Sequence, residues 1–536
     1  MQVQTWMDEK EALKAAGVEL PQYDVANVKA EGEKNPKWIH FGGGNLFRAF
    51  HAELAHELAN IDELDAGLIV CDTHDDSVIN NVYRPYDNNM LEVIMNADGT
   101  LQKKLLTIVS GAYYAVPGTE DYKAVANYFE NPSLQFATVT ITEKGYALKR
   151  PDGTYLPVVE EDFANGPEKA KHTMSIMTSL LWHRFKAGEY PIAMVSTDNF
   201  SQNGKRFQQS LLEVAEAWEQ KGFVTGAFVK YLKDDKKVSF PWSMIDRITP
   251  NPAESVRKEL EAEGFTGMDI VHTPKGTNIA PFANTETVHY LVVEDSFPNG
   301  RPALEKVGVM LTTRETVDKA DRMKVTTCLN PLHTALAVSG CLLGYTRISA
   351  EMKDPDLVAL IKHIGYEEGL PVVENPGILS PQTFIDELLE KRLPNPNIPD
   401  APQRIACDTS QKVPIRFGET IRSYVAADDK DPKTLKFIPL VIAVWLRYLL
   451  GKDDKGVDFT ISPDPLLPML TEQLKSLALG VTDAATIHSA VQPILSNETI
   501  FGSNLYEVGL GEKVEAYLAE LLEGPKAVRK TIHKYV

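Results

Sequence analysis

The sequence predicts an α/β domain with a mainly parallel sheet, followed by a mostly α-helical domain. Short apolar runs such as LIVCD at 68–72 and YPIAMV at 190–195 have the length and composition of buried strands. Helical patterns such as HTMSIMTSLLWHRF lie between them, and alternating strands and helices are typical of a parallel sheet. After about residue 312, helical periodicity dominates, as in KFIPLVIAVWLRYLLG. The predicted structure therefore changes from α/β to mainly α-helical near the middle of the chain.

The length supports this division into domains. A chain of 536 residues is too long for one ordinary core, so about two large domains are expected. We expect residues 1–36 to form a polar extension packed on the first domain, 37–312 to form the α/β domain, and 313–536 to form the helical domain.

Composition limits the classes of partner. The 43% hydrophobic and 24% charged residues are typical of a soluble globular protein, and the net charge of −19 disfavours nucleic acid and anionic membranes. A local basic pocket can still bind a small anion. The four cysteines show no CxxC spacing, which argues against structural zinc and fits a reducing cytoplasm. The N-terminus lacks the apolar core of a signal peptide, and the most apolar run, 437–450, is too short to span a bilayer. We expect a cytoplasmic protein.

The first chemical signal is a glycine turn between the strand WIHF and an amphipathic helix. Gly42, Gly43 and Gly44 would let the backbone approach a pyrophosphate at a helix N-terminus. The fingerprint is incomplete because its third position holds Phe47. Asp72 ends the next strand, where an acid binds ribose hydroxyls and repels a 2′-phosphate, so NAD is favoured over NADP. Alternatively, Asp72 only caps a turn. The combination predicts a Rossmann-type dinucleotide-binding domain.

Polar residues follow three further strands of the first domain. TITEKGY places Glu143 beyond one strand, STDNF places Asn199 beyond another, and FPWSMIDRITP contains Asp246 and Arg247. Functional groups gather at the carboxyl ends of parallel strands. Each segment also has a simpler interpretation. TITEKGY could hold a charged pair in a solvated turn, STDNF an Asp-Asn turn, and FPWSMIDRITP a structural ion pair.

The segment RMKVTTCLNPLHTAL combines Lys324, Asn330 and His333. Asparagine is a favoured N-cap and proline is favoured at the first helical position, so a helix is expected with Asn330 as its cap and Pro331 at that first position. His333 would lie in the first turn, and Lys324 would belong to the preceding element. A core-edge histidine and a solvated lysine are the simpler interpretations.

Taken together, these segments resemble the mannitol dehydrogenase family, a group of long-chain polyol dehydrogenases that includes fructuronate and tagaturonate reductases. HFGGGNLFRAFHA, TITEKGY, STDNF, FPWSMIDRITP and VVEDSFPNGRPALE occur in the family's order. DRMKVTTCLNPLH, NPNIPDAPQRIACDTSQKVPIRF and AVWLRYLLGKDDKG follow in turn. The resemblance implies a Rossmann-type domain, a helical domain, an active site in the cleft between them, and metal-independent chemistry.

The resemblance also implies roles for catalytic residues. Lys324 matches the general acid/base, and Asn199 and Asn330 match the pair that stabilises the developing oxyanion. His333 matches the residue that orients the substrate carbonyl or hydroxyl, and Glu143 matches an acid on the proton path. Hydride transfer to a ketone builds negative charge on oxygen and requires a proton, so these residue types suit the chemistry.

Binding residues follow from the same resemblance. Asp246 matches a residue at the substrate or nicotinamide end, and Arg404 and Lys412 match residues that bind the distal end of the substrate. The cofactor turn comprises Gly42, Gly43, Gly44, Asn45, Leu46 and Phe47, with Asp72 beyond it.

One departure concerns the lysine. The family pattern has four residues between the lysine and the asparagine, whereas VTTCL makes five here. On a continuous helix one extra residue rotates the lysine by about 100°. A bulge or break before Pro331 would absorb it.

The expected activity is NAD-dependent interconversion of a 2-keto hexuronate and its aldonate, with D-fructuronate and D-mannonate as the favoured pair. Mannitol 2-dehydrogenase and tagaturonate reductase are the alternatives within the family. A catalytically inactive NAD-binding protein is the alternative of another class. A sugar acid or polyol is the expected partner, and the family implies a monomer.

Overall fold

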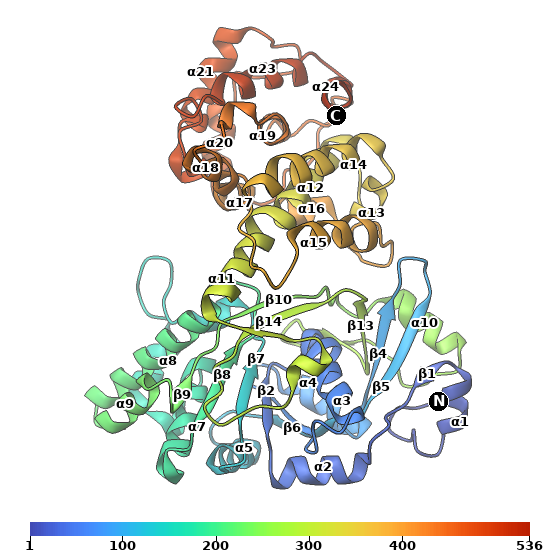
Figure 1. Cartoon of the computed structure of the whole chain (residues 1–536), viewed down its shortest axis with the longest axis vertical. Helices are drawn as coiled ribbons and strands as arrows, with labels where there is room; N and C mark the ends of the chain where they lie inside the picture. The colour runs from blue at the N-terminus through green and yellow to red at the C-terminus, as the bar shows by residue number, and fades with distance from the viewer. The chain divides into compact units, whose positions relative to one another are not determined.

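The computed structural model describes residues 1–536, which divide into two compact units, Met1–Asp318 and Lys319–Val536. Figure 1 follows the chain from the blue N-terminus to the red C-terminus. The first unit contains the parallel sheet and the second is mainly helical, as the sequence predicted.

The central sheet of the first unit has six strands, all parallel, in the order β6-β3-β2-β7-β8-β9. Its first strand in the chain, β2, lies at the centre with later strands added on either side, which is the Rossmann order. The carboxyl ends of β2, β3 and β7 therefore meet where the strand order reverses. The strands are β2 (Trp38–Phe41), β3 (Leu68–Asp72), β6 (Val109–Tyr114), β7 (Phe136–Val139), β8 (Ile192–Ser196) and β9 (Val238–Ser239).

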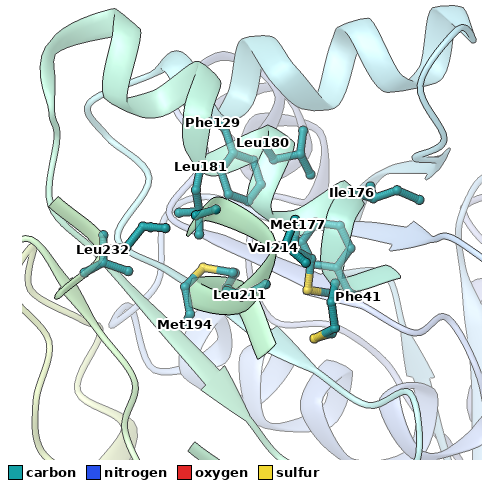
Figure 2. Packing of buried hydrophobic residues seen from close by; sticks show 14 of the residues in the cluster. Phe41, Phe129, Ile176, Met177, Leu180, Leu181, Met194, Leu211, Val214 and Leu232 are labelled. Carbon is teal, nitrogen blue, oxygen red and sulfur yellow. The ribbon is translucent and has the colours of Figure 1, made fainter. Parts of the chain in front are cut away.

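Helices cover both faces of this sheet because each buried strand presents apolar side chains to both sides. Ile39 and Phe41 face a core shared with α5 (Glu120–Glu130), α7 (Thr173–Gly188), α8 (Asn203–Gln220) and α9 (Gly226–Lys233). Figure 2 shows this core, in which Phe41 and Met194 from the strands lie among labelled residues of the covering helices. Trp38 faces the second core with α2 (Val25–Lys34) and α3 (Ala52–Asn60).

Three smaller sheets complete the first unit. One has the order β1-β5-β4-β13, the second β10-β14-β15, and the third is the hairpin β11-β12. The N-terminal residues belong to this unit, because β1 pairs with β5 and Leu13 of α1 (Lys10–Ala15) lies in the adjoining core. The strands are β1 (Val18–Glu19), β4 (Met90–Met95), β5 (Leu101–Leu106), β10 (Ser243–Asp246), β11 (Val271–His272), β12 (Asn278–Ile279), β13 (Phe282–Glu286), β14 (Tyr290–Glu294) and β15 (Met310–Thr312).

The second unit is built around α12 and α19, two helices whose residues are mostly buried. The run that the sequence marked as most apolar forms α19, which is buried along its whole length. No helix in the protein is both long and apolar enough to cross a membrane. The main helices here are α12 (Asn330–Leu343), α14 (Pro355–Lys362), α15 (Pro381–Glu387), α16 (Pro402–Ile405), α17 (Thr409–Arg416), α18 (Gly418–Ala426), α19 (Phe437–Tyr448), α21 (Ala484–Leu495), α23 (Gly511–Leu521) and α24 (Ala527–Tyr535).

Candidate functional site

The glycine turn lies at the carboxyl end of β2, and its first residue has a backbone that only glycine accommodates well. Gly42 has φ +110°, and a Cβ there would lie 2.0 Å from the carbonyl oxygen of Thr140. A Cβ at Gly44 would meet no atom within 4 Å, so the space beside it is open. Tyr83 donates its hydroxyl to the Gly43 carbonyl at 2.7 Å and holds the turn in place. This open, side-chain-free backbone fits the close approach of a pyrophosphate.

The residues after the turn divide between the site and the core. Asn45 donates Nδ2 to the carbonyl of Asn278 at 3.1 Å, while its Oδ1 is buried without a hydrogen-bond partner. Leu46 is half-buried. The Phe47 ring is fully buried and stacks on His40, with ring centroids 4.4 Å apart. Only the backbone of Phe47 is therefore left for a cofactor.

Asp72 ends β3 beside the glycine turn and also forms a turn of its own. Its Oδ1 accepts hydrogen bonds from the amides of His74 and Asp75, both at 2.8 Å. Burial raises the pKa of the Asp72 carboxyl, and the amides that it faces, including that of Gly43, oppose the rise. The turn-capping role is therefore real, and it orients the carboxylate that we predict to bind the ribose.

The loops after β7 and β8 are joined by Asp198, which the sequence treated only as a turn residue. Its buried carboxylate accepts from the amides of Ile141 (2.8 Å) and Thr142 (2.9 Å) and from the Tyr146 hydroxyl (2.7 Å). Thr142 has φ +66°, an unfavourable backbone for threonine that needs such support. Asp198 thereby positions the segment that carries Glu143.

Glu143 and Asn199 are exposed beyond these strand ends. Glu143 begins the 3₁₀ turn Glu143–Tyr146 and pairs with Arg206 at 2.6 Å. Within the first unit Glu143 is therefore paired with a residue of α8, and its proton-path role stays a prediction. Asn199 directly follows the anchored Asp198, so its backbone is held in place.

Asp246 ends β10, where it is buried opposite Tyr290 of β14. The structural ion pair belongs to its neighbour Arg247, which contacts Glu53 and lies 3.3 Å from Glu92. Arg247 is therefore a core residue of the first unit, while Asp246 stays a predicted substrate residue.

Lys324 stands at the start of a π-helical turn, Lys324–Cys328, which continues α11 (Arg314–Met323). The Leu329 amide donates to the Lys324 carbonyl at 3.0 Å, a bond that spans five residues instead of four. A π turn accommodates one extra residue without shifting the flanking helix, so the excess predicted from VTTCL is absorbed here. The lysine side chain is 1% exposed, with Nζ 3.9 Å from Asp321 Oδ1.

The helix start was predicted one residue too late. Leu329 occupies the cap position with φ −121° and ψ −63°, and Asn330 is the first residue of α12. The Asn330 side chain does not cap the helix, because the π turn continues to Cys328 and places the break at Leu329. Asn330 is half-buried, and its carbonyl accepts from the Thr334 hydroxyl at 3.0 Å.

His333 lies in the first turn of α12, as predicted, and faces Asp400. Its Nε2 is 2.6 Å from Asp400 Oδ2, although the ring does not meet the carboxylate with straight hydrogen-bond geometry. Asp400 also contacts Arg404, four residues later. Burial raises the pKa of the Asp400 carboxyl, but His333 and Arg404 outweigh it and hold that pKa below its ordinary value. The carboxylate thereby orients both predicted substrate residues.

A basic cluster extends from this pair along α17. Lys412 donates to the carbonyls of Ile405 (3.0 Å) and Cys407, and burial followed by the nearby charges of Arg416 and Arg404 lowers its pKa. Arg416 donates to the Thr334 hydroxyl at 2.6 Å, and burial lowers its pKa to about 10. Helix α12 contacts α16, α17 and the π turn, so these cations gather around its first turns.

The structure thus brings the predicted residues together in two sets. The first set lies in contacting elements of the second unit and comprises Lys324, Asn330, His333, Arg404 and Lys412. The second set, the cofactor turn and Asp72, meets at one sheet edge of the first unit. Sequence reasoning missed Asp198, Asp400 and Arg416. The i, i+4 spacing of Asp400 with Arg404, and of Lys412 with Arg416, is the signal that could have revealed the last two. No group of three or more acidic, histidine or cysteine residues is arranged to hold a metal ion.

Comparisons with known proteins agree with this architecture. The mannitol dehydrogenase Rossmann domain matches residues 36–306, and the mannitol dehydrogenase C-terminal domain matches residues 316–522. The chain is 49% identical over 530 residues to the D-mannonate oxidoreductase of Thermotoga maritima, covering 98% of this chain and 97% of that protein. It is 28% identical over 481 residues to the polyol:NADP oxidoreductase of Gluconobacter oxydans, covering 88% and 90%.

A solved structure is similar over nearly the whole chain. The Pseudomonas fluorescens mannitol 2-dehydrogenase in ternary complex with NAD and D-mannitol has a TM-score of 0.70 and 26% identity, with 98% of each chain covered. With both domain models matched in order, this chain belongs to the mannitol dehydrogenase family and is an oxidoreductase of secondary alcohols.

Proposed function

We propose that this protein interconverts D-fructuronate and D-mannonate, with NAD(H) as the hydride carrier. The basic cluster of Arg404, Lys412 and Arg416 is the observation that supports a sugar acid. Three cationic groups gather around α12 in a chain whose net charge is −19. A substrate carboxylate would be attracted to such a cluster and repelled by the rest of the surface. The similarity to a D-mannonate oxidoreductase supports the same substrate.

The residues at the glycine turn fit the dinucleotide. Gly44 offers open space for a pyrophosphate at a helix N-terminus, and Asp72 is the proposed acceptor for ribose hydroxyls. When bound, the nicotinamide supplies or accepts the hydride. Asp198 keeps the loops beyond β7 and β8 in place, so that the sheet edge is ordered before any substrate arrives.

Lys324 is the proposed acid and base. During reduction of the ketone, its ammonium gives one proton to the oxygen that gains negative charge, and the neutral amine recovers a proton from water. Its side chain is almost completely buried at the junction of α11 and α12, so its position is fixed by packing. Asn199 and Asn330 are proposed as amide donors to the same oxygen, and His333, fixed by Asp400, is proposed to orient it.

The deciding experiment compares NADH oxidation with D-fructuronate, D-tagaturonate and D-fructose. We expect fructuronate to have the highest kcat/KM. Turnover of fructose alone would refute the uronate substrate and favour mannitol 2-dehydrogenase activity. Turnover of none of the three, with NADH still bound, would favour an inactive cofactor-binding protein.

Lys324→Ala tests the catalytic role. General acid–base catalysis is worth about 10²- to 10⁴-fold, so kcat should fall by that factor while NADH binding is retained. Lys353→Ala is the matched control, because Lys353 is an exposed lysine of the same unit. An unchanged kcat in Lys324→Ala would remove the lysine from the mechanism.

A further inference from the structure

A β-hairpin reaches the cofactor loops from a distant part of the chain. Strands β11 and β12 pair Val271 with Ile279, and the turn between them closes through the Thr273 amide on the Thr277 carbonyl at 2.9 Å. Gly276 adopts φ +86° within this turn. The hairpin is therefore complete through its own backbone bonds, and its remaining polar groups are available for other contacts.

Those remaining groups bind the loops after β2 and β3. Asp75 Oδ2 accepts from the Thr273 hydroxyl at 2.6 Å and from the Thr277 hydroxyl at 2.9 Å. The Lys275 ammonium donates to the carbonyl of His74. On the other side, Asn45 of the glycine turn donates to the hairpin carbonyl of residue 278 at 3.1 Å.

Asp75 holds the hairpin in place through hydrogen bonds and does not form an ion pair with Lys275. The carboxylate is 2% exposed and its hairpin partners are uncharged hydroxyls. Burial raises the pKa of Asp75, but these hydroxyls and the amide of Ser77 outweigh it and leave the pKa below its ordinary value. Lys275 is exposed, and no carboxylate forms an ion pair with it.

Lys275, from the hairpin turn, thus contacts the short loop that follows the predicted ribose acid. Asp72 accepts from the amide of His74, and Lys275 donates to the carbonyl of that same residue. The Asp72 carboxylate and the Lys275 ammonium, which come from two different loops, therefore both bond to the backbone of His74. A ribose with two hydroxyls favours the carboxylate, whereas a ribose with a 2′-phosphate favours the ammonium.

We propose that the hairpin β11-β12 helps to recognise the adenosine ribose of the cofactor. Lys275 would contribute to the selectivity between NADH and NADPH, and Asp75 would position Lys275. Asp72 disfavours a 2′-phosphate and Lys275 favours it, so selectivity for NADH over NADPH is the balance of the two. This inference rests on the proposed function, because it needs the dinucleotide at the glycine turn.

The test measures dissociation constants of NADH and NADPH by quenching of tryptophan fluorescence, without any sugar. Asp72→Ser removes the carboxylate while its hydroxyl can still accept from the loop amides, and it should raise NADPH affinity. Adding Lys275→Ala should then lower NADPH affinity about tenfold, the effect of one lost charge-assisted hydrogen bond, and change NADH affinity less than about twofold. Adding Asp75→Ala to Asp72→Ser should give a similar loss of NADPH preference.

The matched control is Lys221→Ala in the Asp72→Ser background. Lys221 is exposed at the end of α8, away from the carboxyl edge of the sheet, and its removal changes the net charge equally. An equal fall in NADPH affinity in this control would overturn the proposal. An unchanged ratio of NADH to NADPH affinity after Lys275→Ala would also overturn the proposal. An equal loss of affinity for both nucleotides would do the same. If the unmodified protein binds neither nucleotide, the cofactor assignment itself fails, which is a different result from NADH binding with unaltered selectivity.

Discussion

The π turn at Lys324–Cys328 makes a direct prediction about chain length in this segment. One residue of α-helix corresponds to 100° of rotation and 1.5 Å of rise. At a Cβ radius of about 3.3 Å, a rotation of 100° moves the start of the lysine side chain by roughly 5 Å. A displacement of even 1 Å can cost about 10²-fold in rate, so a shift of this size should abolish proton transfer.

Deletion of Val325 should therefore be tolerated. Val325 is half-buried, and its removal leaves the buried Thr327 and Cys328 in their positions relative to α12. The five-residue bond from Leu329 to Lys324 becomes an ordinary four-residue bond, and Lys324 keeps its direction. We expect kcat within about tenfold of the unmodified protein.

Insertion of one residue after Val325 is the matched opposite change. The π turn has already absorbed one excess residue, so a second must rotate Lys324 away from Asn330 and His333. We expect kcat to fall at least about 10³-fold in mannonate oxidation, measured by NADH absorbance. Thermal unfolding followed by circular dichroism checks that both variants fold. Equal losses in the folded deletion and insertion variants would refute the idea that the π turn keeps the lysine in register.

The remaining predictions concern single side chains. The two carboxylate oxygens of Asp198 accept three hydrogen bonds, and Asp198→Asn replaces one of these oxygens by an NH2 group that cannot accept. The loop that carries Glu143 should therefore loosen, with about 2–4 kcal/mol less stability in urea unfolding and a lower kcat; an unchanged stability would contradict its anchoring role. Arg404→Gln should lower kcat/KM about 10- to 100-fold for fructuronate but much less for fructose, and equal losses would remove Arg404 as a carboxylate partner. The pKa of Asp400 lies below its ordinary value, so its ionised form stabilises the fold above pH 3.8 and this contribution disappears as the pH falls through the folded pKa. Asp400→Asn should therefore lose about 1–2 kcal/mol at pH 7, and the difference from the unmodified protein should shrink in acid unfolding below about pH 4.

Much of the fold follows from local patterns in the sequence. LIVCD forms β3 over the predicted residues, and the helical patterns at 172–185 and 329–345 correspond to α7 and α12. The glycine turn and Asp72 could be placed at the ends of β2 and β3 because strand ends and glycines are local signals, which depend on hydrophobic period and backbone freedom. The continuous apolar run KLLTIVSGAYYAV contributes to both β5 and β6, which belong to two different sheets.

The tertiary structure alone decided which distant residues meet. Asp75 and Thr273 are 198 residues apart, and Asp198 and Ile141 are 57 apart, so no local propensity links them. Strand β1 joins β5, and β13 joins β4, through pairings that depend on the packing of a whole sheet. The position of the π turn also depends on tertiary packing. The sequence showed one residue too many before Asn330, but where that residue is absorbed depends on Thr327 and Cys328 being buried while α12 stays in place.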